Sequence, residues 1–174
     1  MKILIGCVLI IALILGVGFG GNVDGYRAVI HKGGFFGADE VSPGHYVIIK
    51  SPEDLEAYIR NMVGHFSLDN AVVPPGYYEG LQAQIRDFYS KFDSNFFKTR
   101  TLVIALVDQG SGSVKYETGG LEMNGGILTV NVLRNAGMIQ TMDFVRWVLL
   151  LELDKAVYPN VTEVKINLVN TGHI

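Results

Sequence analysis

Residues 101–134 read TLVIALVDQGSGSVKYETGGLEMNGGILTVNVLR, and this stretch decides the fold class. Its apolar runs are rich in Val, Ile and Leu, and only short glycine-rich links separate them. Asn124-Gly125 stands between two such runs, a spacing typical of a β-hairpin. The other link is Gly110-Ser111-Gly112-Ser113. The stretch therefore predicts consecutive short β-strands.

The same pattern continues towards the C-terminus, where Tyr158-Pro159-Asn160 marks another turn. Five consecutive strands with short links predict a mainly antiparallel sheet that closes or folds into a sandwich. The expected strands cover residues 101–108, 113–123, 127–134, 144–153 and 162–169.

Two helices are expected before these strands. Ser51 suits the N-cap position, Pro52 the first helical position, and Asp54 completes a capping box with Ser51. Apolar residues then recur at helical spacing until Gly64, which is expected as the residue after the helix end. The predicted helices are 52–63 and 77–91, and short strands are expected at 26–31 and 46–50. The fold class is α+β, a mainly antiparallel β-sheet or sandwich with two covering helices, preceded by an N-terminal hydrophobic helix.

The N-terminal segment is apolar enough to enter a membrane. Residues 3–21 contain no charged residue and no proline, and residues 3–19 are long enough to cross the hydrocarbon as a helix. Lys2 would stay on the cytoplasmic side and place the domain outside. An uncleaved anchor and a cleavable signal peptide with Gly18 and Gly20 before the cleavage site remain open. A third reading takes residues 4–7, which end in Cys7, as a lipoprotein cleavage box.

These features divide the chain into a signal peptide or membrane anchor at 1–21, a glycine-rich spacer at 22–44 and one β-rich domain at 45–174. Lys2 is the only charged residue of the first range, so the remaining chain carries 13 Lys and Arg against 17 Asp and Glu. This acidic balance gives no electrostatic footprint for nucleic acid.

Cofactor and metal sites are not expected. Cys7 is the only cysteine, so the domain has neither an intrachain disulfide nor a thiolate metal cluster. The four histidines form no metal-binding spacing. Trp147 lies in an apolar run and is expected in the core.

The loop at residues 110–113 is the one stretch that suggests a binding site. It is not a P-loop, and it is not a nucleophile elbow. Its amides and hydroxyls could contact a peptide or an anion, which makes Ser111, Gly112 and Ser113, with the nearby Tyr116, the candidate binding residues. The competing interpretation is a tight loop between strands that needs glycine for positive φ.

Residues 92–169 carry a family resemblance. The order Phe96-Phe97, an apolar strand, Gly110-Ser111-Gly112-Ser113, a glycine hairpin and Thr141-Met142-Asp143 leading to Trp147 resembles the PrcB-like C-terminal domain family of small bacterial secreted or lipoprotein domains. The resemblance implies a β-rich, non-enzymatic extracytoplasmic module and a surface protease complex as the type of partner. It transfers no catalytic residue, and the helix at 77–91 departs from the family pattern.

The first hypothesis is therefore an extracytoplasmic protein-binding module of a bacterial cell envelope that is not an enzyme and stabilises or regulates a protease complex. The alternative is a small-ligand or glycan-binding domain that uses the same loop. A hydrolase whose acidic residues converge only in the fold is the third hypothesis.

Overall fold

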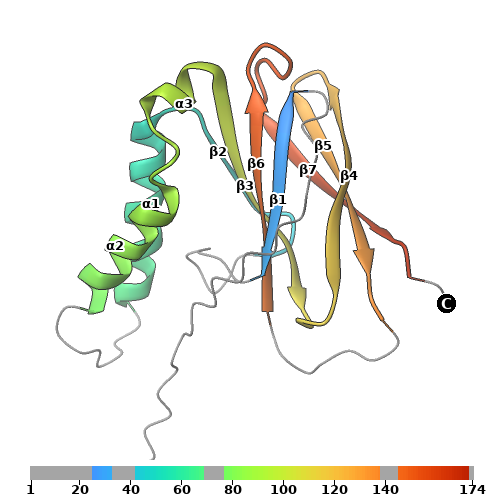
Figure 1. Cartoon of the computed structure of the whole chain (residues 1–174), viewed down its shortest axis with the longest axis horizontal. Coiled ribbons are helices and arrows are strands. Elements are labelled where there is room, and N and C mark those ends of the chain that lie inside the picture. Colours follow the sequence, from blue (N-terminus) through green and yellow to red (C-terminus); the bar gives the residue numbers. More distant parts are fainter. Residues whose placement is uncertain (1–24, 33–41, 69–76, 138–144, 173–174) are drawn as a thin grey trace, which may run out of the picture.

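The computed structural model describes residues 25–32, 42–68, 77–137 and 145–172. The described elements form three layers, with helices on one face of a first sheet and a second sheet on its other face (Figure 1). The helices are α1 (Pro52–Leu68), α2 (Tyr77–Tyr89) and α3 (Ser94–Thr99). Sheet A contains, in spatial order, β1 (Tyr26–Lys32), β6 (Val145–Asp154), β3 (Arg100–Gly110) and β2 (Tyr46–Ile49). Sheet B contains β4 (Lys115–Asn124), β5 (Ile127–Asn135) and β7 (Glu163–Asn170).

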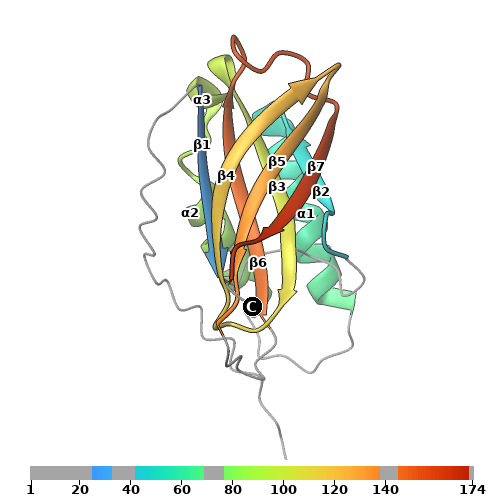
Figure 2. The ribbon, with the colours of Figure 1, turned by 90° about the vertical axis from the view of Figure 1, so that its right-hand side faces the viewer.

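The expected sheet-rich α+β class is confirmed. Every pair of neighbouring strands in sheet A is antiparallel, and β4 and β5 form an antiparallel hairpin. The pairing of β5 with β7 is parallel, because the chain passes through β6 in sheet A before it returns to sheet B. Figure 2 shows sheet B in front of sheet A, with the helices behind both sheets. No described element covers the outer face of sheet B.

Two apolar cores lie on the two faces of sheet A. Successive side chains of a strand point to opposite faces, so Val103 and Ala105 of β3 join the core between the sheets. Leu102, Ile104 and Leu106 join the core under the helices. This double burial explains the unbroken apolar run of β3, as is usual for a strand covered on both sides.

The N-terminus of α1 follows the expected capping pattern. The Ser51 hydroxyl accepts a hydrogen bond from the Asp54 N–H at 3.1 Å, and the Asp54 carboxylate accepts one from the Lys50 N–H at 3.0 Å. The expected end at Gly64 is wrong, because α1 continues through that glycine to Leu68. A glycine inside a helix costs only about 1 kcal/mol relative to alanine, which the rest of a packed helix can offset.

The second predicted helix, 77–91, is shorter in the structure. Helix α2 ends at Tyr89 in a tight turn, in which the Ser90 N–H donates to the Asp87 carbonyl and the Phe92 N–H to the Tyr89 carbonyl. Asp93 then caps α3, a helix that the sequence reasoning did not predict. Its carboxylate accepts hydrogen bonds from the N–H groups of Asn95 and Phe96, which lowers the pKa of Asp93.

The hairpin predicted from Asn124-Gly125 is confirmed, with the turn displaced by one residue. Asn124 pairs with Ile127, so the two loop residues are Gly125 and Gly126. Both have positive φ, +56° and +88°, as the twist of a two-residue hairpin requires.

The strand expected at 26–31 is β1 at the edge of sheet A, so the folded domain includes part of the range predicted as spacer. The hydrophobic segment at 1–21 and the Thr141-Met142-Asp143 element of the family resemblance lie outside the described residues. Among the helices that the structure describes, none is both long and apolar enough to cross a membrane.

Candidate functional site

The candidate loop joins the two sheets at one end of the sandwich. Gly110 ends β3 in sheet A, and β4 begins at Lys115 in sheet B. The residues from Ser111 to Val114 form a tight turn, in which the Val114 N–H donates to the Ser111 carbonyl at 3.3 Å. We call residues 110–113 the Ser loop. Its two glycines do not have positive φ, so the expected conformational reason for them is wrong.

Hydrogen bonds from distant strands hold the backbone of the Ser loop. Nε1 of Trp147, on β6, donates to the Ser111 carbonyl at 3.4 Å. Nζ of Lys32, at the end of β1, donates to the Gly112 carbonyl at 3.1 Å. Side chains from two strands of sheet A therefore anchor two consecutive carbonyls of the loop.

The two serines interact with each other as well. Their Oγ atoms lie 2.8 Å apart, and the Ser113 N–H donates to Ser111 Oγ at 3.2 Å. Ser111 is half-buried and Ser113 is exposed. Serine is well suited to such a turn because its hydroxyl can bond the backbone two residues on.

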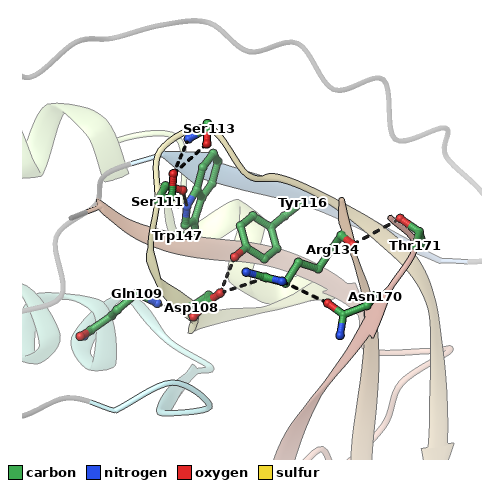
Figure 3. A network of polar contacts seen from close by, with 9 residues as sticks. All are labelled: Asp108, Gln109, Ser111, Ser113, Tyr116, Arg134, Trp147, Asn170 and Thr171. Atoms are coloured by element: carbon green, nitrogen blue, oxygen red, sulfur yellow. Dashed lines mark hydrogen bonds and ion pairs between the residues drawn. The ribbon is translucent and has the colours of Figure 1, made fainter. Parts of the chain in front are cut away.

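Tyr116 lies beneath the loop and not on its surface. It is 9% exposed, and its ring centroid lies 5.0 Å from that of Trp147, which is also 9% exposed. Figure 3 shows the two rings side by side between the loop and the interior. The expectation of a core position for Trp147 is confirmed. The structure thus brings the four candidate residues together, but Tyr116 supports the loop from below.

The hydroxyl of Tyr116 belongs to a polar network that joins the sheets (Figure 3). It donates to the carboxylate of Asp108, which ends the apolar part of β3. Nε of Arg134, on β5, lies 3.6 Å from the same carboxylate, and its Nη1 donates to Asn170 of β7 at 3.2 Å. We call Asp108, Tyr116, Arg134 and Asn170 the inter-sheet network. Burial and the hydrogen bond to Asp108 raise the pKa of Tyr116 to about 12.

A β-bulge explains how Asp108 reaches sheet B. The pairing register of β3 with β6 shifts between Leu106 and Asp108, which leaves Val107 as the extra residue. Without the bulge, Asp108 would follow Leu106 onto the helix side of sheet A, because side chains alternate. With the bulge, both Val107 and Asp108 face sheet B. A sequence pattern does not reveal this shift, so the sequence reasoning missed Asp108 and Arg134.

A second charged cluster lies near the opposite end of β6. Glu152 is a buried acid whose carboxylate lies within ion-pairing distance of Arg27 on β1, Lys91 after α2 and Arg100 on β3. We call these four residues the Glu152 cluster. In the pairing of β3 with β6, Asp108 lies opposite Trp147, five residues before Glu152. At about 3.3 Å per residue, the two acids are roughly 16 Å apart along the strand, which exceeds the spacing of a glycosidase pair.

The described residues place no three His, Cys, Asp or Glu side chains where they could hold a metal ion together. Each buried side-chain nitrogen or oxygen of the described residues has a hydrogen-bond partner.

Comparison with known proteins found no matching family model, curated protein or solved structure. The resemblance to the PrcB-like family therefore stays a prediction.

Proposed function

We propose that this chain is an extracytoplasmic protein-binding module of a bacterial cell envelope, that it is not an enzyme, and that the Ser loop contacts its protein partner. The observation that carries the proposal is the anchoring of the loop backbone by Trp147 and Lys32. A loop that is ordered before it binds loses less conformational entropy on association, so more of its contact energy appears as affinity. Ser113 is exposed at its tip.

The direction of β1 supports this placement of the loop. The hydrophobic segment ends near Gly21, and the chain from there to Tyr26 spans at most roughly 18 Å in any conformation. If the segment anchors the chain, the Tyr26 end of β1 lies near the membrane. Lys32 and the Ser loop then lie about 20 Å further along the strand, towards a partner. The proposal includes a protease complex as the partner, which rests on the family resemblance alone.

The proposal can be tested by site-specific cross-linking of the full chain in bacterial membranes. Cys7 is first changed to alanine, so that Ser113→Cys provides a unique thiol for a photoactivated cross-linker. The matched control is Ala156→Cys, an exposed position in the turn after β6 at the opposite end of the sandwich. We expect one adduct of defined mass from position 113 and not from position 156. The proposal fails if position 113 gives no adduct, or the same adducts as position 156.

The second candidate, a small-ligand or glycan-binding domain, is favoured by the 2.8 Å approach of the two serine hydroxyls. A hydroxyl pair of this kind can bond the hydroxyls of a sugar. The double change Ser111→Ala and Ser113→Ala separates the two candidates in a glycan-binding assay on folded protein. Loss of glycan binding without loss of thermal stability supports this candidate, and absence of glycan binding by the unchanged chain excludes it.

A further inference from the structure

The Glu152 cluster gathers cations that lie far apart in the sequence. Glu152 Oε1 lies 3.9 Å from Nη1 of Arg27 and 3.6 Å from Nζ of Lys91, and Glu152 Oε2 lies 3.2 Å from Nη1 of Arg100. The carboxylate is held in place because its side chain is only 10% exposed. One negative charge therefore fixes the positions of three positive charges, and the cluster has a formal charge of +2.

The outer two cations remain accessible to solvent. The side chains of Arg27 and Lys91 are 56% and 51% exposed, whereas that of Arg100 is 34% exposed. Arg100 makes the hydrogen bond to Glu152, so the buried acid keeps a partner without the other two. A guanidinium carries five N–H donors and an ammonium three. Arg27 and Lys91 therefore have donors beyond those that face Glu152, although the Lys91 ammonium also lies over the Phe92 ring, 4.6 Å from its centroid.

Two further acids at this end, Asp93 and Asp154, are engaged with backbone groups. The Asp93 carboxylate accepts hydrogen bonds from the backbone at the start of α3. The Asp154 carboxylate accepts one from the Ala156 N–H at 2.8 Å. Both are engaged with backbone amides, while Glu152 is the acid that the cations surround.

The place of the cluster in the fold indicates which anion it would meet. Arg27 is the second residue of β1 and follows Tyr26 directly. The chain from Gly21 to Tyr26 reaches at most roughly 18 Å. The cluster therefore lies at the end of the domain that an inserted N-terminal segment would hold against the bilayer, where the phosphate groups of the lipid headgroups lie.

We propose that Arg27 and Lys91, held in place by Glu152, bind the phosphate groups of anionic phospholipids and so seat this end of the domain on the membrane. The inference rests on the membrane anchor at residues 1–21 that the proposed function uses. It adds that a defined surface of the folded domain also contacts the membrane. The Ser loop then points away from the bilayer, because it lies at the other end of β1.

The test uses the full chain, with Cys7 changed to alanine and an environment-sensitive fluorophore on Ala156→Cys. The protein is reconstituted into vesicles of phosphatidylcholine alone and into vesicles that also contain phosphatidylglycerol, each with a quencher in the headgroup region. We expect stronger quenching at position 156 when phosphatidylglycerol is present, and reversal by high salt, which screens exposed charges. A label on Ser113→Cys should show no such increase.

The variants Arg27→Gln and Lys91→Gln assign the effect to the cluster. Each cation near an anionic leaflet shifts the ratio of docked to undocked domain roughly five-fold, so the double variant should lower it about twenty-five-fold. Lys115→Gln is the matched control, since it removes an exposed lysine from the start of β4, at the Ser-loop end of the sandwich. Thermal melts check that each variant is folded.

Two outcomes would overturn the inference. The first is equal quenching in neutral and anionic vesicles, which is also the result expected if the cluster binds an acidic protein or free inorganic phosphate. The second is an anionic-lipid effect that persists in folded Arg27→Gln, Lys91→Gln protein. Failure of the tether itself is distinguishable, because the chain would then not float with neutral vesicles.

Discussion

The carboxylate of Asp108 accepts a hydrogen bond from the hydroxyl of Tyr116 across the interface between the two sheets. Asp108 belongs to β3 of sheet A and Tyr116 to β4 of sheet B, and the Ser loop is the chain that connects them. The same carboxylate accepts the Gln109 N–H at 2.7 Å. A hydrogen bond therefore joins β3 to β4 directly below the Ser loop that connects these two strands.

Tyr116→Phe should lower the stability of the domain, because it removes the hydroxyl from a partly buried carboxylate. A hydrogen bond to a charged group is worth about 1.5 to 3 kcal/mol. For a domain of this size that corresponds to a decrease in Tm of roughly 3–12 °C, measured by circular dichroism. The ring packing against Trp147 should be preserved, since the phenylalanine ring has the same shape.

Tyr26→Phe is the control for this prediction. Tyr26 is partly buried against the same core and packs edge to face on Tyr158. Its change removes a hydroxyl without touching the inter-sheet network, so its Tm should stay near that of the unchanged chain. Equal Tm values for the two variants would show that the bond between Asp108 and Tyr116 contributes little.

The glycines of the chain should differ in how well they accept alanine. Gly126 has φ of +88°, and a Cβ there would lie 3.0 Å from Oγ1 of Thr162 and 3.3 Å from the Asn160 carbonyl. Gly126→Ala should therefore cost about 1–3 kcal/mol, through backbone strain and this close contact. Gly125→Ala, with positive φ but open space, should cost about 1–2 kcal/mol.

Gly110→Ala provides the comparison, since Gly110 does not have positive φ and its Cβ would meet nothing within 4 Å. Urea unfolding of the three variants should give the order of destabilisation Gly126, then Gly125, then Gly110. Gly125→Ala and Gly126→Ala variants that are as stable as Gly110→Ala would contradict the assignment of the strained turn to residues 125–126.

The features predictable from the sequence are those that arise from local patterns. The cap at Ser51 and Asp54 involves four consecutive residues, and the hairpin depends on a two-residue glycine turn. Both are readable because the interacting groups are neighbours in the chain. The strands of the C-terminal half were recognised from their apolar runs for the same reason.

The features that were missed depend on contacts between distant residues. A register shift at Val107 turns Asp108 towards Tyr116, and no local pattern records that shift. The Glu152 cluster unites residues from four separate segments of the chain. The composition of the chain is acidic, so the cationic surface near Arg27 is visible only after the fold has gathered its members. For the candidate site, the run of glycine and serine residues predicts the position of the Ser loop. It does not predict that Trp147 and Lys32 donate hydrogen bonds to the loop backbone.

His31 gives the domain a pH dependence of stability whose sign is determined by its environment. Burial under α2, where its ring contacts Phe88 with centroids 5.7 Å apart, and the nearby charge of Lys91 lower the pKa of His31 below 6.5. The unfolded chain then binds more protons than the folded chain at pH values between the two pKa values. Stability contributed by neutral His31 is present above about pH 6.5 and is lost as the pH falls towards the folded pKa.

His31→Phe tests this prediction, because phenylalanine keeps an aromatic ring against Phe88 and does not titrate. The free energy of unfolding should fall less between pH 7.5 and pH 5 in the variant than in the unchanged chain, by about 1.4 kcal/mol for each unit of pKa shift. Measurements at pH 8, where His31 is neutral in both states, correct for the change in packing. Parallel pH profiles for the two proteins would refute the prediction.

Trp147→Phe and Lys32→Gln should both loosen the Ser loop, with different effects on stability. Trp147 is buried, so its replacement removes the hydrogen bond to the Ser111 carbonyl together with part of a packed ring. A loss of about 1–3 kcal/mol is expected. Lys32 is exposed, and its bond to the Gly112 carbonyl is worth less than about 1 kcal/mol to the global stability.

The comparison of these two variants separates loop order from stability. If the two anchors order the loop for binding, both variants should exchange the Ser113 and Val114 amide hydrogens faster than the unchanged chain. Both should also give less of the partner adduct from a cross-linker at position 113, although only Trp147→Phe lowers the Tm. A Lys32→Gln variant with normal exchange and normal cross-linking would show that the loop keeps its shape without that anchor. The order that the proposed function requires would then come from Trp147 and the turn itself.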